Sequence, residues 1–146
     1  MVSEEIVRGL KAEGVNLFVT LPCDRAKPLI NKVSTSFRHI ALANEQEGVG
    51  ICAGASLAGA KPAMLVQSSG VGYIVNAICS LTKLYELPLL ILVSWRGVYK
   101  ESIPAQIMLG ERLPSILSAI DVEYDTVESP KDIPKVVKAA TNASTT

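Results

Sequence analysis

The sequence predicts an α/β fold: a doubly wound, mainly parallel sheet with helices on both faces. Helical and strand-like patterns alternate along the chain, which is typical of right-handed βαβ units. The run at residues 88–93, Pro-Leu-Leu-Ile-Leu-Val, is apolar throughout, as in a strand covered by helices on both sides. Hydrophobic residues make up 49% of the chain and aromatic residues only 5%, so small aliphatic side chains must fill the core. We expect residues 1–146 to form a single domain.

Helices and strands follow from apolar spacing and from start and stop signals. The first predicted helix, residues 3–13, begins at Ser3, buries one apolar face and stops at Gly14. The other predicted helices cover residues 28–36, 44–60, about 73–85, 104–119 and a last segment that starts at Ser129-Pro130. The predicted strands cover residues 16–21, 39–43, 62–66, 88–93 and 122–127. Residues 68–72 and 95–103 are predicted as loops, and the polar tail 141–146 is expected to fray.

The junction between the second strand and the third helix carries the main candidate residue. Asn44 is a suitable N-cap, and Glu47 stands at the spacing of a capping box. Glu45 has no such capping role. A carboxylate in a first turn is also favoured by the helix dipole alone, so a structural and a catalytic role are both open for Glu45 at this point.

The order of elements brings four segments together. Ligands of doubly wound sheets bind beyond the carboxyl ends of the strands. Residues 22–24, 44–45, 68–73 and 95–103 each follow a predicted strand, and we therefore expect them at one edge. Gly70 and Gly72 resemble the start of a dinucleotide fingerprint, but the third glycine and the acidic partner are missing. A tight turn and a loop approached by a ligand remain equally open for them.

Composition excludes several classes of function. Fourteen basic and fourteen acidic residues cancel, and no basic run marks a nucleic-acid surface. Three cysteines and one histidine lack the spacing of a zinc site, so no metal ligands are predicted in this chain. Residues 62–82 are uncharged, but the polar run 67–72 argues against a membrane span. Reduced thiols and an acidic start favour a cytoplasmic protein.

Several motifs together resemble the pyrimidine-binding domain of thiamine-diphosphate-dependent decarboxylases. They are Asn44-Glu45-Gln46, Ala53-Gly54, Lys61-Pro62-Ala63, the run at 67–72, Asn76-Ala77 and Trp95-Arg96-Gly97. The resemblance runs from about Ser3 to Val127 and is strongest to the branch that acts on 3-sulfopyruvate or phosphonopyruvate. Within that branch, residues 45–55 are especially similar to the sulfopyruvate α-subunit pattern.

The resemblance implies a role for each candidate residue. Glu45 would hydrogen-bond a ring nitrogen of the cofactor's aminopyrimidine and share its proton, which prepares the cofactor as an electron sink for decarboxylation. Pro22 and Gly70-Val71-Gly72 would contact the pyrimidine. Asp24 would be a proton donor beside the substrate, with a turn-stabilising role as an equal alternative.

Two further positions are implied less directly. Gln106 falls near a histidine pair that pyruvate decarboxylases place over the reacting carbon, and this chain lacks those histidines. Arg96 is either a partner for a sulfonate or phosphonate or a solvated loop arginine.

The resemblance also predicts a partner. The family holds the cofactor's diphosphate through Mg2+ on a second domain with a Gly-Asp-Gly motif, and this sequence contains no Gly-Asp-Gly. A separate diphosphate-binding β subunit is therefore expected, with self-association within the heteromer. The implied reaction converts 3-sulfopyruvate to sulfoacetaldehyde and CO2, a step towards coenzyme M. A subunit acting on phosphonopyruvate or another 2-keto acid is an alternative, and a non-catalytic pyrimidine-domain relic that binds a partner is an alternative of another class.

Overall fold

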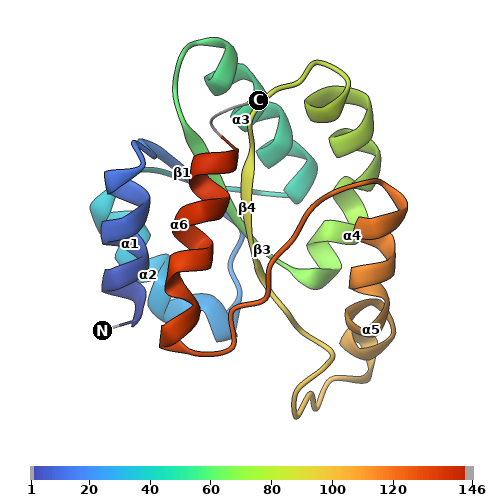
Figure 1. The fold of residues 1–146 in the computed structure, drawn as a ribbon. Helices are drawn as coiled ribbons and strands as arrows, with labels where there is room; N and C mark the ends of the chain where they lie inside the picture. Colours follow the sequence, from blue (N-terminus) through green and yellow to red (C-terminus); the bar gives the residue numbers. More distant parts are fainter. Residues whose placement is uncertain (1, 144–146) are drawn as a thin grey trace.

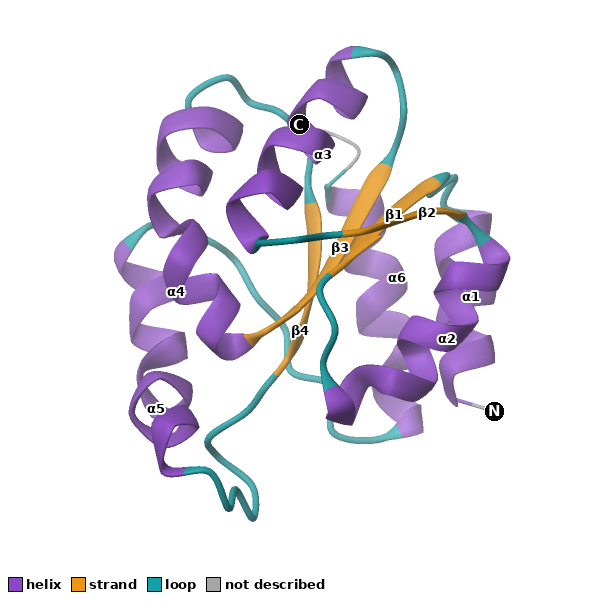
Figure 2. Ribbon diagram, turned by 180° about the vertical axis from the view of Figure 1, so that it is seen from behind, coloured by secondary structure: helices purple, strands orange, loops and turns teal. Residues whose placement is uncertain are grey.

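A four-stranded parallel sheet forms the centre of the molecule (Figures 1 and 2). The computed structural model describes residues 2–143. The strands are β1 (Leu17–Thr20), β2 (Arg38–Ala41), β3 (Pro62–Gln67) and β4 (Leu90–Ser94), in the spatial order β2-β1-β3-β4. Every neighbouring pair is parallel. The predicted fold class is therefore confirmed.

Helices cover both faces of the sheet (Figure 2). One face is covered by α1 (Val2–Ala12), α2 (Lys27–Ser36) and α6 (Ile133–Asn142), and the other by α3 (Glu45–Leu57), α4 (Ser68–Ala77) and α5 (Pro104–Ala119). Side chains alternate along β1 between the two layers: Phe18 packs with the first group of helices and Val19 with the second. Both side chains are fully buried, which explains why the strands are apolar without alternation.

Two sequence predictions are wrong: the loop predicted after the third strand and the predicted fifth strand. Residues 68–72, predicted as a loop, form the first turn of α4, which begins directly at the end of β3. Residues 122–127, predicted as a strand, make no ladder with β4, and both Tyr124 and Val127 are exposed. Only Val122 of this segment packs against the core. One anchored side chain is too little to hold a strand at the sheet edge.

The ends of several helices also differ from their predicted bounds. The helix predicted at about 73–85 is α4 followed by a π-helical turn, Ile78–Lys83. The third helix ends at Leu57, three residues early, and Gly59 follows it in the left-handed region at φ +82°. Thr141 and Asn142 of the predicted frayed tail belong to α6, and residues 144–146 lie outside the described part of the chain. Across residues 2–143, no helix has both the length and the apolar character that crossing a membrane requires.

Candidate functional site

The carboxyl edge of the sheet has the strand order at which doubly wound folds bind their ligands. After β1 the chain passes to β2 on one side, whereas after β3 it passes to β4 on the other side. The strand order therefore reverses between β1 and β3, and segments diverge there. The four segments predicted to meet lie together at this edge: Glu45 contacts Gly70, Ser68 contacts Arg96, and Cys23 contacts Ser94, the residue directly before 95–103.

Glu45 lies at this edge as the first residue of α3. Asn44 caps the helix, since its side-chain oxygen accepts from the Glu47 N–H at 2.9 Å. The Glu47 carboxylate accepts from the Ala43 N–H at 3.0 Å, one residue before the N-cap. Both neighbours thus have capping roles, as predicted, and Glu45 has none.

The Glu45 side chain is nearly buried but has no polar partner. It is 7% exposed. Among residues 2–143 it makes no hydrogen bond and no ion pair. Buried carboxylates are costly unless a donor satisfies them, so this one is suited to a ligand that brings its own N–H.

The first turn of α4 forms the other wall beside Glu45. A Cβ built on Gly70 would meet Glu45 Oε1 and would lie 2.7 Å from its Cγ, so only glycine allows this approach. Gln46 Nε2 donates to the Tyr73 carbonyl at 3.1 Å, which ties α3 to α4. Val71 is 1% exposed and packs in the core, so its contact with a cofactor stays a prediction, as does that of Gly72.

The turn after β1 carries the next candidates. Pro22 and Asp24 are exposed, and Asp24 begins a short 3-10 turn, Asp24–Ala26. In the described chain the Asp24 carboxylate has no hydrogen-bond partner, so no contact supports its turn-stabilising alternative. Cys23 between them is buried and donates to Ser94 Oγ at 3.5 Å. Burial alone would raise the pKa of this thiol, but Ser94, nearby backbone N–H groups and Arg96 lower the pKa below its ordinary value.

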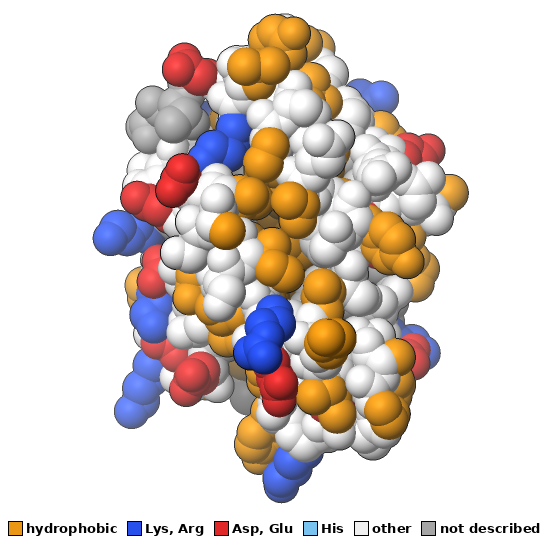
Figure 3. All heavy atoms as spheres, turned by 90° about the vertical axis from the view of Figure 1, so that its right-hand side faces the viewer, with side chains coloured by type: hydrophobic (Ala, Val, Ile, Leu, Met, Phe, Trp, Pro, Cys, Tyr) orange, Lys and Arg blue, Asp and Glu red, His pale blue; other side chains and the backbone are white. Residues whose placement is uncertain are grey.

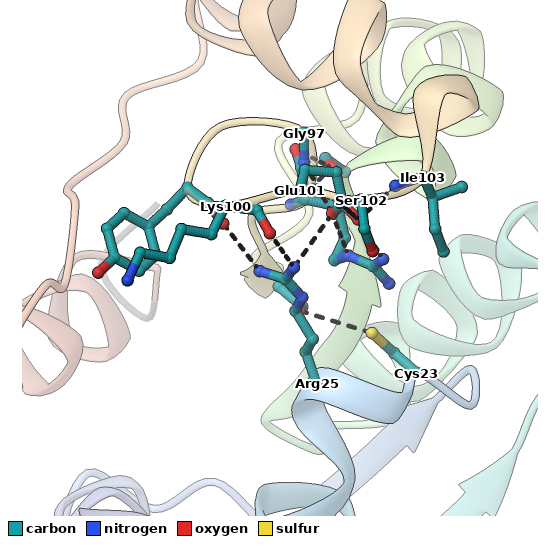
Figure 4. A network of polar contacts seen from close by, with 11 residues as sticks. Cys23, Arg25, Gly97, Lys100, Glu101, Ser102 and Ile103 are labelled. Atoms are coloured by element: carbon teal, nitrogen blue, oxygen red, sulfur yellow. Dashed lines mark hydrogen bonds and ion pairs between the residues drawn. The ribbon is translucent and has the colours of Figure 1, made fainter.

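An ion cluster, Arg25–Glu101–Arg96, in which the side chains of Glu101 and Arg96 are buried and Arg25 is exposed, joins this turn to the loop after β4 (Figure 4). Arg96 Nε and a terminal nitrogen donate to the two Glu101 oxygens at 2.7 and 2.9 Å. Arg96 is only 7% exposed, so the prediction of a solvated loop arginine is wrong. Hydrogen bonding to Arg96 lowers the pKa of Glu101 to about 2, and the same bond raises the pKa of Arg96.

Sequence reasoning missed Arg25 and Glu101. The available signal was position: Glu101 lies in the segment 95–103 predicted to reach the carboxyl edge, and Arg25 directly follows the predicted segment 22–24. Glu101 also accepts from the backbone N–H groups of Gly97, Ser102 and Ile103, and so it fixes the whole loop.

Gln106 lies in the first turns of α5, packed against the same loop. A Cβ built on Gly97 would meet the Gln106 carbonyl, and Gly97 has φ +90°, so this close contact requires glycine. The side-chain oxygen of Gln106 is a buried acceptor without a partner. An unsatisfied buried acceptor of this kind marks a place where a ligand or a partner chain can supply a donor. Its catalytic role stays a prediction.

These residues fit the pyrimidine end of thiamine diphosphate better than its diphosphate end. Glu45 offers a carboxylate without a hydrogen-bond partner, and Gly70 leaves beside it the space that a side chain would fill. Within residues 2–143 no three Cys, His, Asp or Glu side chains are grouped so that they could hold a metal ion. A fold and site of this kind define the pyrimidine-binding domain of thiamine-diphosphate enzymes.

Comparisons with known proteins agree with this class. Residues 1–120 match the family model described as thiamine pyrophosphate enzyme, N-terminal TPP binding domain. The chain is 37% identical to sulfopyruvate decarboxylase subunit alpha of Methanococcus maripaludis, over 97% of this chain and 86% of that protein. It is 36% identical to the same subunit of Methanocaldococcus jannaschii, over 94% of this chain and 82% of that protein. The chain therefore belongs to the thiamine pyrophosphate enzyme family and, within it, to the family of sulfopyruvate decarboxylase alpha subunits.

Two other comparisons differ in coverage. The chain is 49% identical to sulfopyruvate decarboxylase of Methanosarcina acetivorans over 90% of its own length, and it spans only 34% of that longer protein. The 2-oxoglutarate:ferredoxin oxidoreductase from Magnetococcus marinus superposes with a TM-score of 0.74 at 19% identity, over 97% of this chain and 26% of that one. The second likeness is one of fold alone.

Proposed function

We propose that this chain is the α subunit of a thiamine-diphosphate-dependent decarboxylase that converts 3-sulfopyruvate to sulfoacetaldehyde and CO2, as a cytoplasmic step towards coenzyme M. The observation that carries the proposal is the nearly buried, unpartnered carboxylate of Glu45 at the strand-order reversal. The names of the M. maripaludis and M. jannaschii relatives supply the substrate.

Each residue of this chain has a defined task in the proposed reaction. Glu45 holds and releases a proton at its carboxylate where a weakly basic ring nitrogen meets it. Gly70 keeps the first turn of α4 close enough to exclude water from that carboxylate. Asp24, exposed at the same edge, gives the proton that replaces the lost CO2. The unpaired oxygen of Gln106 accepts from a donor that the bound cofactor or the β subunit brings. Thiamine diphosphate, when bound, supplies the electron sink for loss of CO2.

A separate β subunit completes the proposed site by holding the diphosphate and Mg2+. The face formed by α3, α4 and α5 is suited to such a partner, because large apolar side chains are spread over it with few charges (Figure 3). The exposed ones include Leu57, Tyr73 and Met108, at 76%, 69% and 79%. Tyr73 is joined to Gln46, the neighbour of Glu45, so this face continues into the site. Self-association of the heteromer is part of the proposal.

A phosphonopyruvate decarboxylase subunit is the second candidate. The phosphonopyruvate decarboxylase of Streptomyces viridochromogenes is 29% identical over 96% of this chain and 36% of that protein. Its lower identity makes it the weaker choice. Assays with both substrates, and with the β subunit present, also separate the enzyme from a non-catalytic binding module, for which neither substrate is consumed.

Glu45→Gln is the decisive variant. The amide keeps the shape and a hydrogen bond but cannot carry the proton, so kcat for 3-sulfopyruvate should fall about 100- to 10,000-fold with the β subunit, thiamine diphosphate and Mg2+ present. Thiamine diphosphate affinity, measured by calorimetry, should change little.

Glu47→Gln is the matched control. It makes the same chemical change two residues along α3, and its amide oxygen can still accept from the Ala43 N–H. Full activity in Glu45→Gln, or equal losses in both variants, would remove the basis of the proposal.

A further inference from the structure

The loop that carries Arg96 and Glu101 is joined through its backbone to the helical turn that contacts Glu45. Ser68 Oγ donates to the Arg96 carbonyl at 3.1 Å and accepts from the Arg96 N–H at 3.0 Å. Ser68 is the first residue of α4, and Gly70, in the same turn, contacts Glu45. One helical turn rises only 5.4 Å, so the Arg96 backbone, from which the cluster extends, lies close to the reactive edge.

The cluster has more positive charge than it neutralises. Two guanidinium groups surround one carboxylate, and the Glu101 side chain is 2% exposed. The nearest acid along the chain, Asp24, forms no ion pair with either arginine within the described residues. Lys100, exposed on the same loop, adds a further positive charge. An anion that reaches the cluster itself therefore meets an excess of positive charge.

Arg25 retains free donors in a fixed position. Its terminal nitrogens donate to the Tyr99 and Lys100 carbonyls at 3.2 and 3.3 Å and approach Glu101 at 3.6 Å. A guanidinium has five N–H groups, and these contacts leave others unused. The Arg25 side chain is 40% exposed, against 9% for Arg96. Arg25 is thus held in place while part of its donor set faces outward.

We propose that Arg25, held in place by Glu101 together with Arg96, binds the sulfonate group at the far end of the 2-keto acid; this assignment rests on the proposed function. In 3-sulfopyruvate the sulfonate is one methylene away from the reacting carbonyl, so its site must adjoin the one that activates the cofactor. The three oxygens of a sulfonate suit the planar donor fork of arginine. Glu101 is a positioning residue, because it orients both guanidinium groups without facing the substrate.

Arg25→Gln tests the assignment in the complete complex with the β subunit, thiamine diphosphate and Mg2+. KM for 3-sulfopyruvate, and the Kd of the unreactive analogue 3-sulfopropanoate measured by calorimetry, should both rise about 10- to 100-fold, the scale of a hydrogen bond to a charged group. Propanoate, which lacks the sulfonate, should bind equally to both proteins. Arg25→Lys should recover part of the affinity, because it keeps the charge and loses the fork.

Lys27→Gln is the matched control. Lys27 is exposed two residues further on, makes no hydrogen bond or ion pair within residues 2–143, and loses the same charge. It should leave both constants within about twofold of the wild type. Equal effects in the two variants would mean a general charge field, and equal weakening of propanoate would mean a disordered loop; either result overturns the assignment.

Two outcomes separate this assignment from the proposed reaction. A wild-type complex that decarboxylates 3-sulfopyruvate while Arg25→Gln is unaffected keeps the reaction and refutes the sulfonate site. Arg25-dependent binding of 3-sulfopropanoate without turnover of 3-sulfopyruvate supports the sulfonate site and refutes the proposed reaction. Tighter Arg25-dependent binding of 3-phosphonopropanoate than of 3-sulfopropanoate would overturn the choice of sulfonate.

Discussion

The close contact between Gly70 and Glu45 predicts that a single added methyl group at residue 70 lowers activity. In Gly70→Ala the new Cβ would meet Glu45 Oε1 and lie 2.7 Å from its Cγ, so the Glu45 side chain must turn away from its Cβ outward to make room. The carboxylate then leaves its position, and activity with the β subunit should fall about 100-fold, as for a catalytic group misplaced by roughly 1 Å. The thermal midpoint of the chain should change little.

Gly50→Ala provides the comparison. Gly50 lies in the middle of α3, and a Cβ there has no atom within 4 Å. Alanine should stabilise the chain by about 0.5–1 kcal/mol, since glycine is the weaker helix former, and leave kcat unchanged. If Gly70→Ala retained full activity, the position of Glu45 would not depend on that glycine.

Local chemistry identifies Glu45 but not the cluster beside it. The capping roles of Asn44 and Glu47 are encoded within four residues, and they leave Glu45 as the unexplained carboxylate. Arg25 and Glu101 are 76 positions apart in sequence and meet only because two loops share one sheet edge. No local pattern predicts such a pair, and so its residues were not singled out from the sequence.

At the scale of elements, tertiary packing overrides local propensity at α4. Two glycines in five residues predict a loop, yet the helix begins directly at Ser68. Gly70 is needed where the helix meets Glu45, and Ser68 bonds both polar groups of the Arg96 backbone. The local cost of glycine is thus offset by contacts that the sequence does not reveal.

The cap of α3 is the element whose contribution to stability is easiest to measure. Asn44→Ala removes the acceptor for the Glu47 N–H and should lower the free energy of unfolding by about 1 kcal/mol. Urea unfolding followed by circular dichroism measures the change. Asn76→Ala, on an exposed turn of α4, should be neutral or slightly stabilising because no cap is lost. Equal effects of the two changes would mean that the cap contributes nothing.

For the whole molecule, the alternation of helices and strands was sufficient to predict two helical layers around a parallel sheet. The layers themselves follow from the strands, in which Ala63 and Leu65 face one side and Met64 and Val66 the other. Among the predicted strands, the one at residues 122–127 does not form, because its strand-like composition lacks a neighbouring strand to pair with. Pairing depends on the global arrangement, and composition alone does not supply it.

Two of the three cysteines, Cys52 and Cys79, test whether this architecture opens as one unit. Cys79 is exposed, whereas Cys52 is fully buried between α3 and the sheet, where burial raises the pKa of its thiol to about 12. At pH 8 Cys79 should react at once with a disulfide reagent, because the reactive species is the exposed thiolate. Cys52 should react only as fast as the chain unfolds. Its reaction rate should therefore depend on urea in the same way as unfolding followed by circular dichroism. Cys52→Ala assigns the slow phase, and a slow phase that does not depend on urea would mean that α3 separates from the sheet while the rest stays folded.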